Sequence, residues 1–218
     1  MFPRHPRRRR PPEVAKLEIL NAADRVFAES QPDQVGLKEV AREAGVSHAL
    51  VTHYFGSFAA LIEAALERRV RALREKILIK LQEPGVLARP GELIGVLFAA
   101  LDDPVHRRLM RWLLASERPG ATHAFAFRDQ GLHQIALGIG NALTPDAAGT
   151  FINKIELALV TAVAAAYGYS LAKYALVGAL GRHGSKELDA EVQATLAAML
   201  QAHLRTELAA AGVKIAEG

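Results

Sequence analysis

The stretch LKEVAREAGVSHALVTHYFGS, residues 37–57, decides how this sequence of 218 residues is interpreted. It has the pattern of two short helices separated by Gly45, because glycine readily adopts the left-handed conformation that ends a helix. Ser47 follows at the N-cap position of the second helix, and Gly56 ends that helix. The second helix carries small hydrogen-bonding side chains where a core helix would be apolar. The stretch therefore predicts a helix-turn-helix with a polar outer face.

The apolar residues of this stretch indicate how its two helices pack. Val40 and Ala41 of the first helix and Val51 of the second are expected to face inward, and Ala41 is small enough for a close crossing. Val51 and Phe55 are assigned to the core. The outward positions are then Ser47, His48, Ala49, Thr52 and His53. A helix with such a face fits the major groove of B-DNA, which is about 12 Å wide.

The whole chain is predicted to be all-α. Half of its residues are hydrophobic, and no segment has the alternating pattern of a strand. Apolar residues recur at helical spacing, as in the first helix with Val14, Leu17, Leu20, Ala23, Val26 and Phe27. The expected helices span about residues 13–29, 37–44, 47–55, 57–81, 91–101, 104–116, 122–142, 145–180 and 186–211.

The basic charge is concentrated near the N-terminus. Residues 1–80 hold 15 Lys/Arg and 10 Asp/Glu, although the net charge of the whole chain is only +4. Four prolines exclude a helix from residues 1–12, which we interpret as a disordered basic arm. The arm is expected to reach phosphates or a minor groove through Arg7, Arg8, Arg9 and Arg10. The alternative is a solvated tail without a role.

Several classes of protein are disfavoured by what the sequence lacks. It has no cysteine, which excludes disulfides and thiol chemistry, and its eight histidines lack metal-ligand spacing, so we expect no metal and no cofactor. No phosphate-binding glycine loop is present, and a small helical enzyme is the less favoured alternative. No signal peptide is expected, and the apolar residues 157–180, interrupted by Lys173, are interpreted as a helix buried inside a protein or an oligomer rather than a membrane span.

Residues 19–66 resemble the DNA-binding domain of the TetR family of bacterial transcriptional regulators. The resemblance is carried by ILNAADRVFAES, residues 19–30, and by VGLKEVAREAGVSHALVTHYFGSFAALIEAAL, residues 35–66. It implies a cytoplasmic regulator whose helical C-terminal domain dimerises and often holds a small ligand. The Pro-Gly pairs within residues 82–92 mark a boundary. We therefore expect a DNA-binding domain with a linking helix at 13–80 and a helical effector-binding and dimerisation domain at 81–218.

Three positions depart from the family pattern. Gly36 stands where a Ser or Thr usually caps the helix that begins at Leu37. Thr52 replaces a common Tyr, and Phe58 replaces a Lys that usually contacts phosphate. The basic arm is a candidate replacement for that missing contact.

Base contacts are expected from the outward face of the recognition helix. His48 and Thr52 are predicted to approach base edges, and Ala49 and Leu50 to meet a thymine methyl group. Leu50 suits the protein core equally well, and a solvated His48 without a contact is the alternative for that residue.

Phosphate contacts are expected beside them. Ser47, His53 and Tyr54 are predicted to bind phosphates and to fix the register, and Lys38 to reach the backbone or the groove edge. The alternatives are a solvated His53 and a Tyr54 that packs on the first helix.

The last two helices are expected to form a four-helix bundle with the same pair from a second copy. The first of them is apolar all round and needs cover on every side. Small residues on it would permit close approach: Ala162, Ala164, Ala165, Gly168 and Gly178. A homodimer would place two recognition helices one DNA turn apart, on an approximately palindromic operator. The alternative is an ordinary core helix within one chain.

An effector pocket is expected between the fourth helix and the three that follow. Its candidate lining residues are Leu97, Phe98, Leu101, Trp112, Phe125, Phe127, His133 and Tyr167. This lining favours a small apolar ligand with few charges. The predicted function is a repressor that occludes a promoter and is released by this ligand. The alternatives are that these side chains are core and that the regulator has no small-molecule effector.

Overall fold

The computed structural model describes residues 11–116, 131–143 and 148–210, and within them every regular element is helical. The helices are α1 (Pro12–Glu29), α2 (Leu37–Ala44), α3 (His48–Phe55), α4 (Phe58–Lys80), α5 (Pro90–Leu101), α6 (Pro104–Ala115), α7 (Gly131–Leu143), α8 (Ala148–Ala179) and α9 (Lys186–Ala210). Two short 3-10 turns lie at Pro32–Gln34 and Val86–Ala88. The prediction of an all-α fold is confirmed.

Two of the observed helix boundaries bear on the sequence predictions. α1 begins at Pro12, within the segment that we expected to be non-helical, because proline at the first helical position loses no intrahelical hydrogen bond. α7 is described from Gly131, so residues 122–130 of the predicted helix lie outside the described residues, as do Arg7–Arg10 of the arm.

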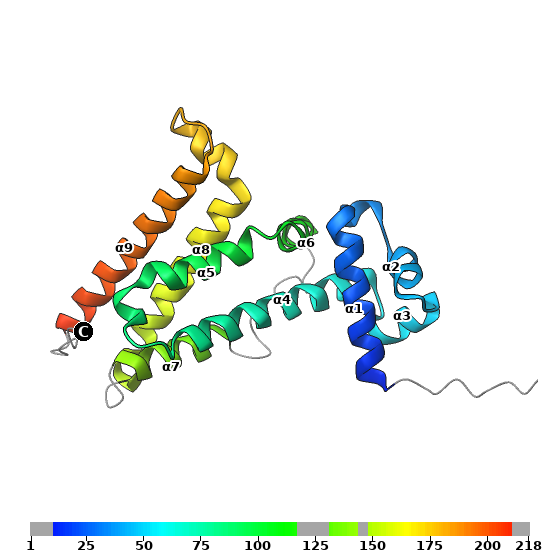
Figure 1. Ribbon diagram of the computed structural model, residues 1–218, viewed down its shortest axis with the longest axis horizontal. Coiled ribbons are helices and arrows are strands. Elements are labelled where there is room, and N and C mark those ends of the chain that lie inside the picture. The colour runs from blue at the N-terminus through cyan, green and yellow to red at the C-terminus, as the bar shows by residue number, and fades with distance from the viewer. Residues whose placement is uncertain (1–10, 117–130, 144–147, 211–218) are drawn as a thin grey trace, which may run out of the picture.

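The long helix α4 connects two groups of helices (Figure 1). α1, α2 and α3 gather around its N-terminal end, while α5, α7, α8 and α9 lie towards its C-terminal end. α6 is seen end-on between the two groups and packs against both α1 and α4.

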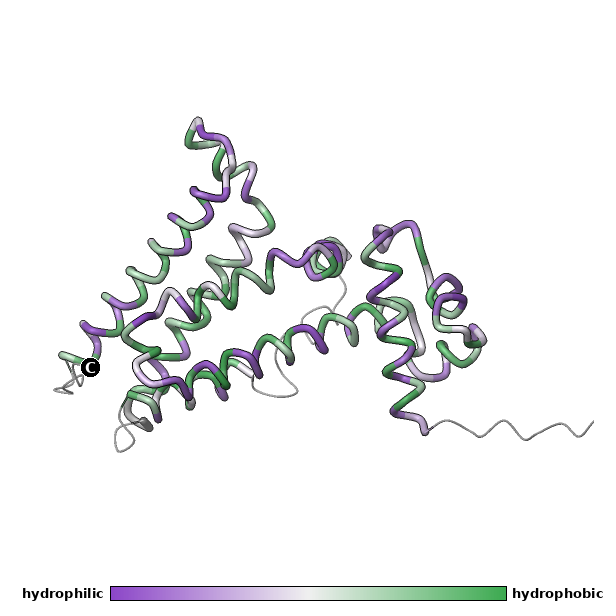
Figure 2. The backbone as a smooth tube through the Cα atoms, viewed as in Figure 1, coloured by the Kyte–Doolittle hydropathy of each residue, from purple (hydrophilic) through white to green (hydrophobic). Residues whose placement is uncertain are grey.

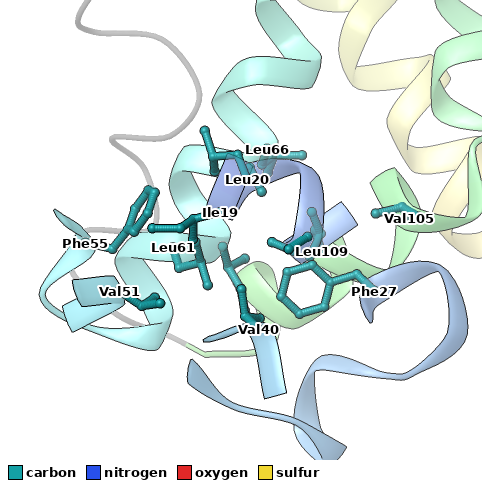
Figure 3. Packing of buried hydrophobic residues seen from close by; sticks show 14 of the residues in the cluster. Ile19, Leu20, Phe27, Val40, Val51, Phe55, Leu61, Leu66, Val105 and Leu109 are labelled. Atoms are coloured by element: carbon teal, nitrogen blue, oxygen red, sulfur yellow. The ribbon is translucent and has the colours of Figure 1, made fainter. Parts of the chain in front are cut away.

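The core of the N-terminal group extends beyond the first four helices (Figure 3). Val40, Val51 and Leu61 are fully buried there. Four residues of α6 belong to the same cluster, namely Val105, Leu109, Met110 and Leu113. The predicted domain boundary near residue 80 therefore cuts across a shared core, and the division of the chain at that point stays a prediction.

The predicted apolar stripe of α1 is wrong at its first two positions. Val14 and Leu17 are 44% and 52% exposed, whereas Ala15, Ile19 and Ala22 are buried. The inward face of α1 is therefore rotated by about one residue in its first turns relative to the predicted stripe. The buried set keeps the i, i+4, i+7 spacing that helical packing requires.

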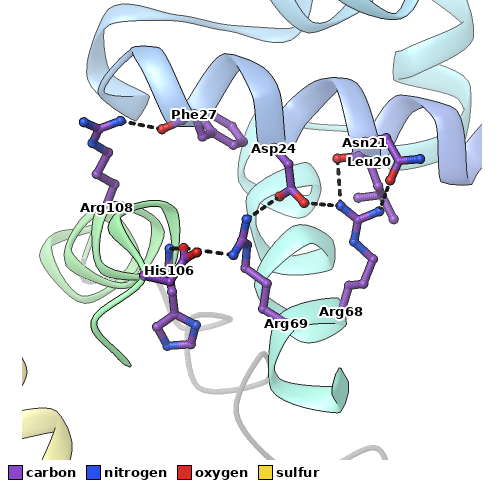
Figure 4. Close-up of polar contacts among 9 residues, drawn as sticks. Leu20, Asn21, Asp24, Phe27, Arg68, Arg69, His106 and Arg108 are labelled. Carbon is purple, nitrogen blue, oxygen red and sulfur yellow. Dashed lines mark hydrogen bonds and ion pairs between the residues drawn. The ribbon is translucent and has the colours of Figure 1, made fainter. Parts of the chain in front are cut away.

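Charged side chains fix α6 and α4 to α1 (Figure 4). Nη1 of Arg108 on α6 donates to the carbonyl oxygens of Phe27 and Ala28, at 2.7 and 2.5 Å, in the last turn of α1. Asp24 of α1 pairs with both Arg68 and Arg69 of α4. Arg69 also donates to Oδ1 of Asp103, which caps the N-terminus of α6.

The helix α8 is not covered on all sides within one chain. Its segment Phe151–Ala179 is long and apolar enough to span a membrane by length and composition, and 22% of its most apolar window is buried. Leu157, Val160 and Leu176 are among its exposed apolar residues. Figure 2 shows hydrophobic residues recurring along the length of this helix. That a second copy covers this exposed face stays a prediction.

We predict that Leu109→Ala destabilises the protein by about 2–5 kcal/mol, because it leaves a cavity in the shared core. Leu114→Ala on the same helix is the matched control, since Leu114 is 55% exposed and its truncation should change stability by no more than ~0.5 kcal/mol. Urea unfolding at one fixed protein concentration measures both. Equal losses in the two variants would contradict a core shared with α6.

Candidate nucleic-acid interface

The turn between α2 and α3 has the geometry that its glycine predicts. Gly45 is left-handed, with φ 65° and ψ 32°, and its N–H donates to the carbonyl oxygen of Arg42 at 3.1 Å. The N–H of Val46 donates to the carbonyl oxygen of Ala41 at 3.0 Å. These two bonds satisfy carbonyl groups that a helix end leaves open. A residue with a β-carbon would be strained at position 45.

The two helices are capped in different ways. Oγ of Ser47 accepts from the N–H of Leu50 at 3.2 Å, as predicted for the N-cap of α3. Before α2, Gly36 has no side chain to serve as a cap, but Oε2 of Glu39 accepts from the N–H of Gly36 at 2.8 Å. Hydrogen bonds from the backbone N–H groups of Glu39 and Gly36 lower the pKa of the Glu39 carboxyl. The sequence therefore supplies the cap from within the helix.

The surface of α3 divides into a buried and an exposed face. Val51 and Phe55 are buried, which confirms their assignment to the core. The exposed residues at this helix are those predicted to face outward: Ser47, His48, Ala49, Thr52 and His53. The structure therefore brings the predicted base-reading and phosphate-binding side chains onto one surface.

Some of the predicted contact residues also have partners within the chain. Leu50 is half-buried, and Tyr54 is half-buried and packs on the N-terminal core. The ring of His53 lies edge-on to that of Tyr54, with 5.3 Å between their centroids. Oγ1 of Thr52 donates to the carbonyl oxygen of His48 at 3.1 Å, so the Thr52 oxygen is left mainly as an acceptor.

Lys38 and Phe58, two further positions near the exposed face of α3, differ in exposure. Lys38 of α2 is exposed and makes no ion pair within the described part of the chain. Phe58, where the family pattern has a lysine, is held between two aromatic rings. Its centroid lies 6.0 Å from that of Phe27 and 5.8 Å from that of Trp112 on α6. The first residue of α4 is therefore a packing residue in this chain.

The predicted effector residues that the structure describes differ in their surroundings. Leu97, Phe98 and Leu101 are buried against one another and against α8 and α9, and Trp112 packs on Phe58. Phe125 and Phe127 lie outside the described residues. Core packing, the alternative considered for these side chains, accounts for the α5 residues among them.

The two polar candidates of this set are each paired. The hydroxyl of Tyr167 lies 3.0 Å from Nε2 of His106, and Nδ1 of His133 lies 2.5 Å from Oε1 of Glu156. Burial, and secondly the charge of Arg69, lowers the pKa of His106 to about 4, while Asp103 opposes this shift. Burial also raises the pKa of Tyr167. The pair of His106 and Tyr167 is therefore neutral at neutral pH.

The described surface includes the following two hollows. One, of about 510 Å³, lies between α7 and α8 and is lined by Leu132, His133, Asn153, Glu156, Leu157 and Val160. The other, of about 360 Å³, lies between α4, α5 and α6 and is lined by Arg69, Ala72, Leu73, Lys76, Val96, Ala99, Ala100, Asp103 and His106. His133 is the one predicted effector residue that lines either hollow. Within the described residues, no group of three or more His, Asp or Glu side chains could hold a metal ion.

Sequence reasoning missed the charged residues that join α1, α4 and α6. Asp24, Arg69 and Arg108 join three helices through contacts between residues far apart in sequence. An arginine on an amphipathic helix gives no local signal of such a partner, because solvated arginines follow the same pattern.

Comparison with known proteins agrees with the helix-turn-helix geometry. Residues 19–65 match the family model described as bacterial regulatory proteins, tetR family. Two uncharacterized HTH-type transcriptional regulators of Mycobacterium tuberculosis, from two strains, are each 32% identical to the chain over 139 residues. The match covers 62% of this chain, which thus spans 65% of the length of these curated relatives.

Solved structures share the fold over most of the chain. A tetR-family transcriptional regulator from Streptomyces coelicolor superposes with a TM-score of 0.62 at 23% identity, covering 90% of this chain and 83% of that one. A putative tetR-family regulator from Mesorhizobium loti gives 0.58 at 17% identity, over 93% and 98%. The TetR family repressor AlkX from Dietzia gives 0.51 at 16% identity, over 85% and 95%.

We predict that Ser47→Ala lowers the free energy of unfolding by about 1 kcal/mol, because it removes the cap of α3. Ser47→Asp is the matched variant, since a carboxylate accepts the same N–H and should keep most of the stability. Thermal unfolding followed by circular dichroism compares the two. A Ser47→Asp protein that is as unstable as Ser47→Ala would show that the hydroxyl is needed for something other than capping.

Proposed function

We propose that this chain is a sequence-specific DNA-binding transcriptional regulator of the TetR type, and the match of residues 19–65 to the model of bacterial regulatory proteins, tetR family, supports this proposal. The observation that carries the proposal is the exposed face of α3. Ser47, His48 and Thr52 present hydroxyl and imidazole groups to solvent on a helix of eight residues, whose opposite side is anchored by Val51 and Phe55. Such a helix suits the major groove, where donors and acceptors distinguish the base pairs.

The roles proposed for individual residues follow from their exposure. His48 and Thr52 read base edges, and Ala49 contacts a thymine methyl group, with Leu50 at the margin of this surface. Thr52 is best suited to accept from a base amino group, because its hydroxyl hydrogen is directed to its own helix.

Phosphate contacts come from residues beside this face. Ser47, His53 and Lys38 are exposed, and the hydroxyl of Tyr54 extends from a ring that packs on the core. Phosphate contacts supply much of the affinity of such proteins and fix their register. With Phe58 packed between rings, the arginines at positions 7–10 are proposed to supply the contact that a lysine makes elsewhere in the family.

We further propose a homodimer formed through α8 and α9. One face of α8 exposes small and apolar residues at helical spacing, namely Leu157, Val160, Ala164, Gly168, Ala172 and Ala175. α9 exposes a similar row, Ala194, Ala198, Ala202 and Ala209, with Met199 beside it. Rows of small residues let helices approach closely, and burying this apolar surface against a second copy is favourable. The operator of such a dimer is approximately palindromic.

The proposed mode of action is repression in the cytoplasm by occlusion of a promoter. The description of AlkX as a repressor supports this direction of regulation. Release follows when a small, mainly apolar molecule binds the C-terminal helices and favours a dimer with the wrong separation between its recognition helices. A regulator without an effector is the second candidate, and the dense packing of Leu97, Phe98 and Leu101 favours it over a ligand at those residues.

We predict that selection from a random pool of DNA duplexes enriches an approximate palindrome. His48→Ala and Thr52→Ala should each weaken binding to the selected duplex by about 1–3 kcal/mol and relax the choice of base at one symmetric pair of positions. His183→Ala is the matched control, because His183 is an exposed histidine on the α8–α9 turn. A pool that yields no enriched sequence would contradict sequence-specific DNA binding.

We predict that Ala164→Glu weakens dimerisation by roughly 2–5 kcal/mol, because it places an unpaired charge in the apolar contact. Ala28→Glu, at an exposed alanine of α1, should leave the dimer intact. Light scattering across a dilution series separates the two variants. A wild-type protein that is monomeric throughout the series would remove the proposed dimer.

A further inference from the structure

The hollow between α4 and α5, beside the start of α6, has features that the proposed function does not use. We refer to it as the α4–α5 groove; its lining is Arg69, Ala72, Leu73, Lys76, Val96, Ala99, Ala100, Asp103 and His106. Its volume of about 360 Å³ is at the lower end of the range for small-molecule sites, ~300–1,000 Å³. Ala72, Lys76 and Ala99 are exposed, so the groove is open to solvent.

The middle of the groove is apolar. α4 contributes Ala72 and Leu73, and α5 contributes Val96, Ala99 and Ala100. Leu73 and the adjacent Leu97 and Phe98 belong to one core cluster, which makes the floor a packed hydrocarbon surface. The alanines leave room above this floor for an apolar body that would otherwise remain in water.

Charged side chains lie at both ends of the groove, but only one end has a charge without an ion-pair partner among the described residues. At the α6 end, Arg69 pairs with Asp24 and Asp103, and Oδ1 of Asp103 also accepts from the N–H of His106. At the other end, the ammonium group of Lys76 makes no ion pair within the described residues. Lys80, one turn further along α4, is paired with Glu83 and Glu92. Lys76 is therefore the uncompensated cation of the groove.

The two ends are separated by the length of a short ligand. Lys76 follows Arg69 by seven residues, which places them about 10 Å apart along the helix axis at a rise of ~1.5 Å per residue. An anion at the α6 end would meet the carboxylate of Asp103, whereas an anion at the Lys76 end meets only the ammonium group. The charge distribution therefore selects a molecule with a single anionic head at the Lys76 end.

We propose that the α4–α5 groove binds a small anionic amphiphile. Its apolar body lies along Leu73, Val96 and Ala100, and its anionic head pairs with Lys76. The regulatory role of this ligand rests on the proposed function, whereas its binding does not. As the effector of the proposed regulator, the ligand lies beside Arg69 and Asp103. Arg69 is the side chain that joins the groove to Asp24 on α1, so the site is one residue away from the DNA-binding helices.

Isothermal titration calorimetry of the full-length protein with octanoate tests this site. The neutral 1-octanol and the cationic octylammonium, which carry the same octyl chain length, serve as comparison ligands. Octanoate is expected to bind more tightly than octanol, and octylammonium more weakly than both. Shortening the carboxylate by one methylene should raise Kd about fourfold for each group removed. Equal affinities for octanoate and octanol would overturn the assignment of the head to Lys76.

Variants locate the site on the protein. Lys76→Gln should weaken octanoate binding about three- to fivefold, as expected for an exposed ion pair, and leave octanol unchanged. Lys186→Gln, at an exposed lysine of α9, is the matched control and should leave both unchanged. Ala99→Phe should fill the groove and weaken both probes. Octanoate binding that survives Ala99→Phe, or no octanoate binding by the wild-type protein, overturns the proposal.

The binding assay contains no DNA, so its outcome is independent of the proposed function. If the protein selects a palindrome but does not bind octanoate, the proposed function is supported and the proposal for the groove is wrong. If the protein binds octanoate through Lys76 but selects no DNA sequence, the proposal for the groove is supported and the proposed function is wrong.

Discussion

The guanidinium group of Arg108 donates to carbonyl groups in the last turn of α1, and this directional contact holds α6 against the N-terminal helices. The C-terminal end of a helix carries unsatisfied carbonyl oxygens and partial negative charge, so an arginine there makes charge-assisted hydrogen bonds. Such bonds contribute about 1.5–3 kcal/mol each when well formed. Apolar packing alone would hold α6 near α1 but would define its register less sharply, because dispersion contacts are not directional.

The helix α6 packs against both groups of helices. Leu109 and Leu113 lie in the core that α6 shares with α1–α4, while His106 on the same helix lies beside Tyr167 of α8. Trp112 reaches Phe58, the first residue of α4, which follows the end of α3 by only three residues. A displacement of α6 would therefore act on the N-terminal end of α4 directly, and not only through the length of that helix.

Features set within a few residues were predicted from the sequence, whereas features set by distant partners were not. Gly45 and Ser47 determine the turn through backbone conformation and a local cap, and Val51 and Phe55 are apolar on an otherwise polar helix. By contrast, the inward face of α1 was predicted one residue out of place, because its first turns hold apolar residues on both sides. Leu97 and Phe98 of the candidate pocket are apolar for packing, and composition does not distinguish packing from ligand binding. The role of Arg108 depends on a helix far away in sequence and had no local signal.

The exposed face of α3 and the exposed face of α8 differ in their hydration. In the proposed complex, this difference would assign sequence discrimination to α3 and the free energy of association to α8. Hydroxyl and imidazole groups on α3 are exposed to water in the free protein, so the proposed base contacts would replace water contacts and would yield discrimination more than binding energy. The face of α8 that carries Leu157 and Val160 is poorly hydrated, so its burial is favourable by about 25 cal/mol for each Å² removed from water. A second copy covering that face would add a second α3 without a further cost of association, which doubles the number of bases read. The proposed dimer is thus stabilised by the surface that carries no sequence information, and α3 is left free to read sequence.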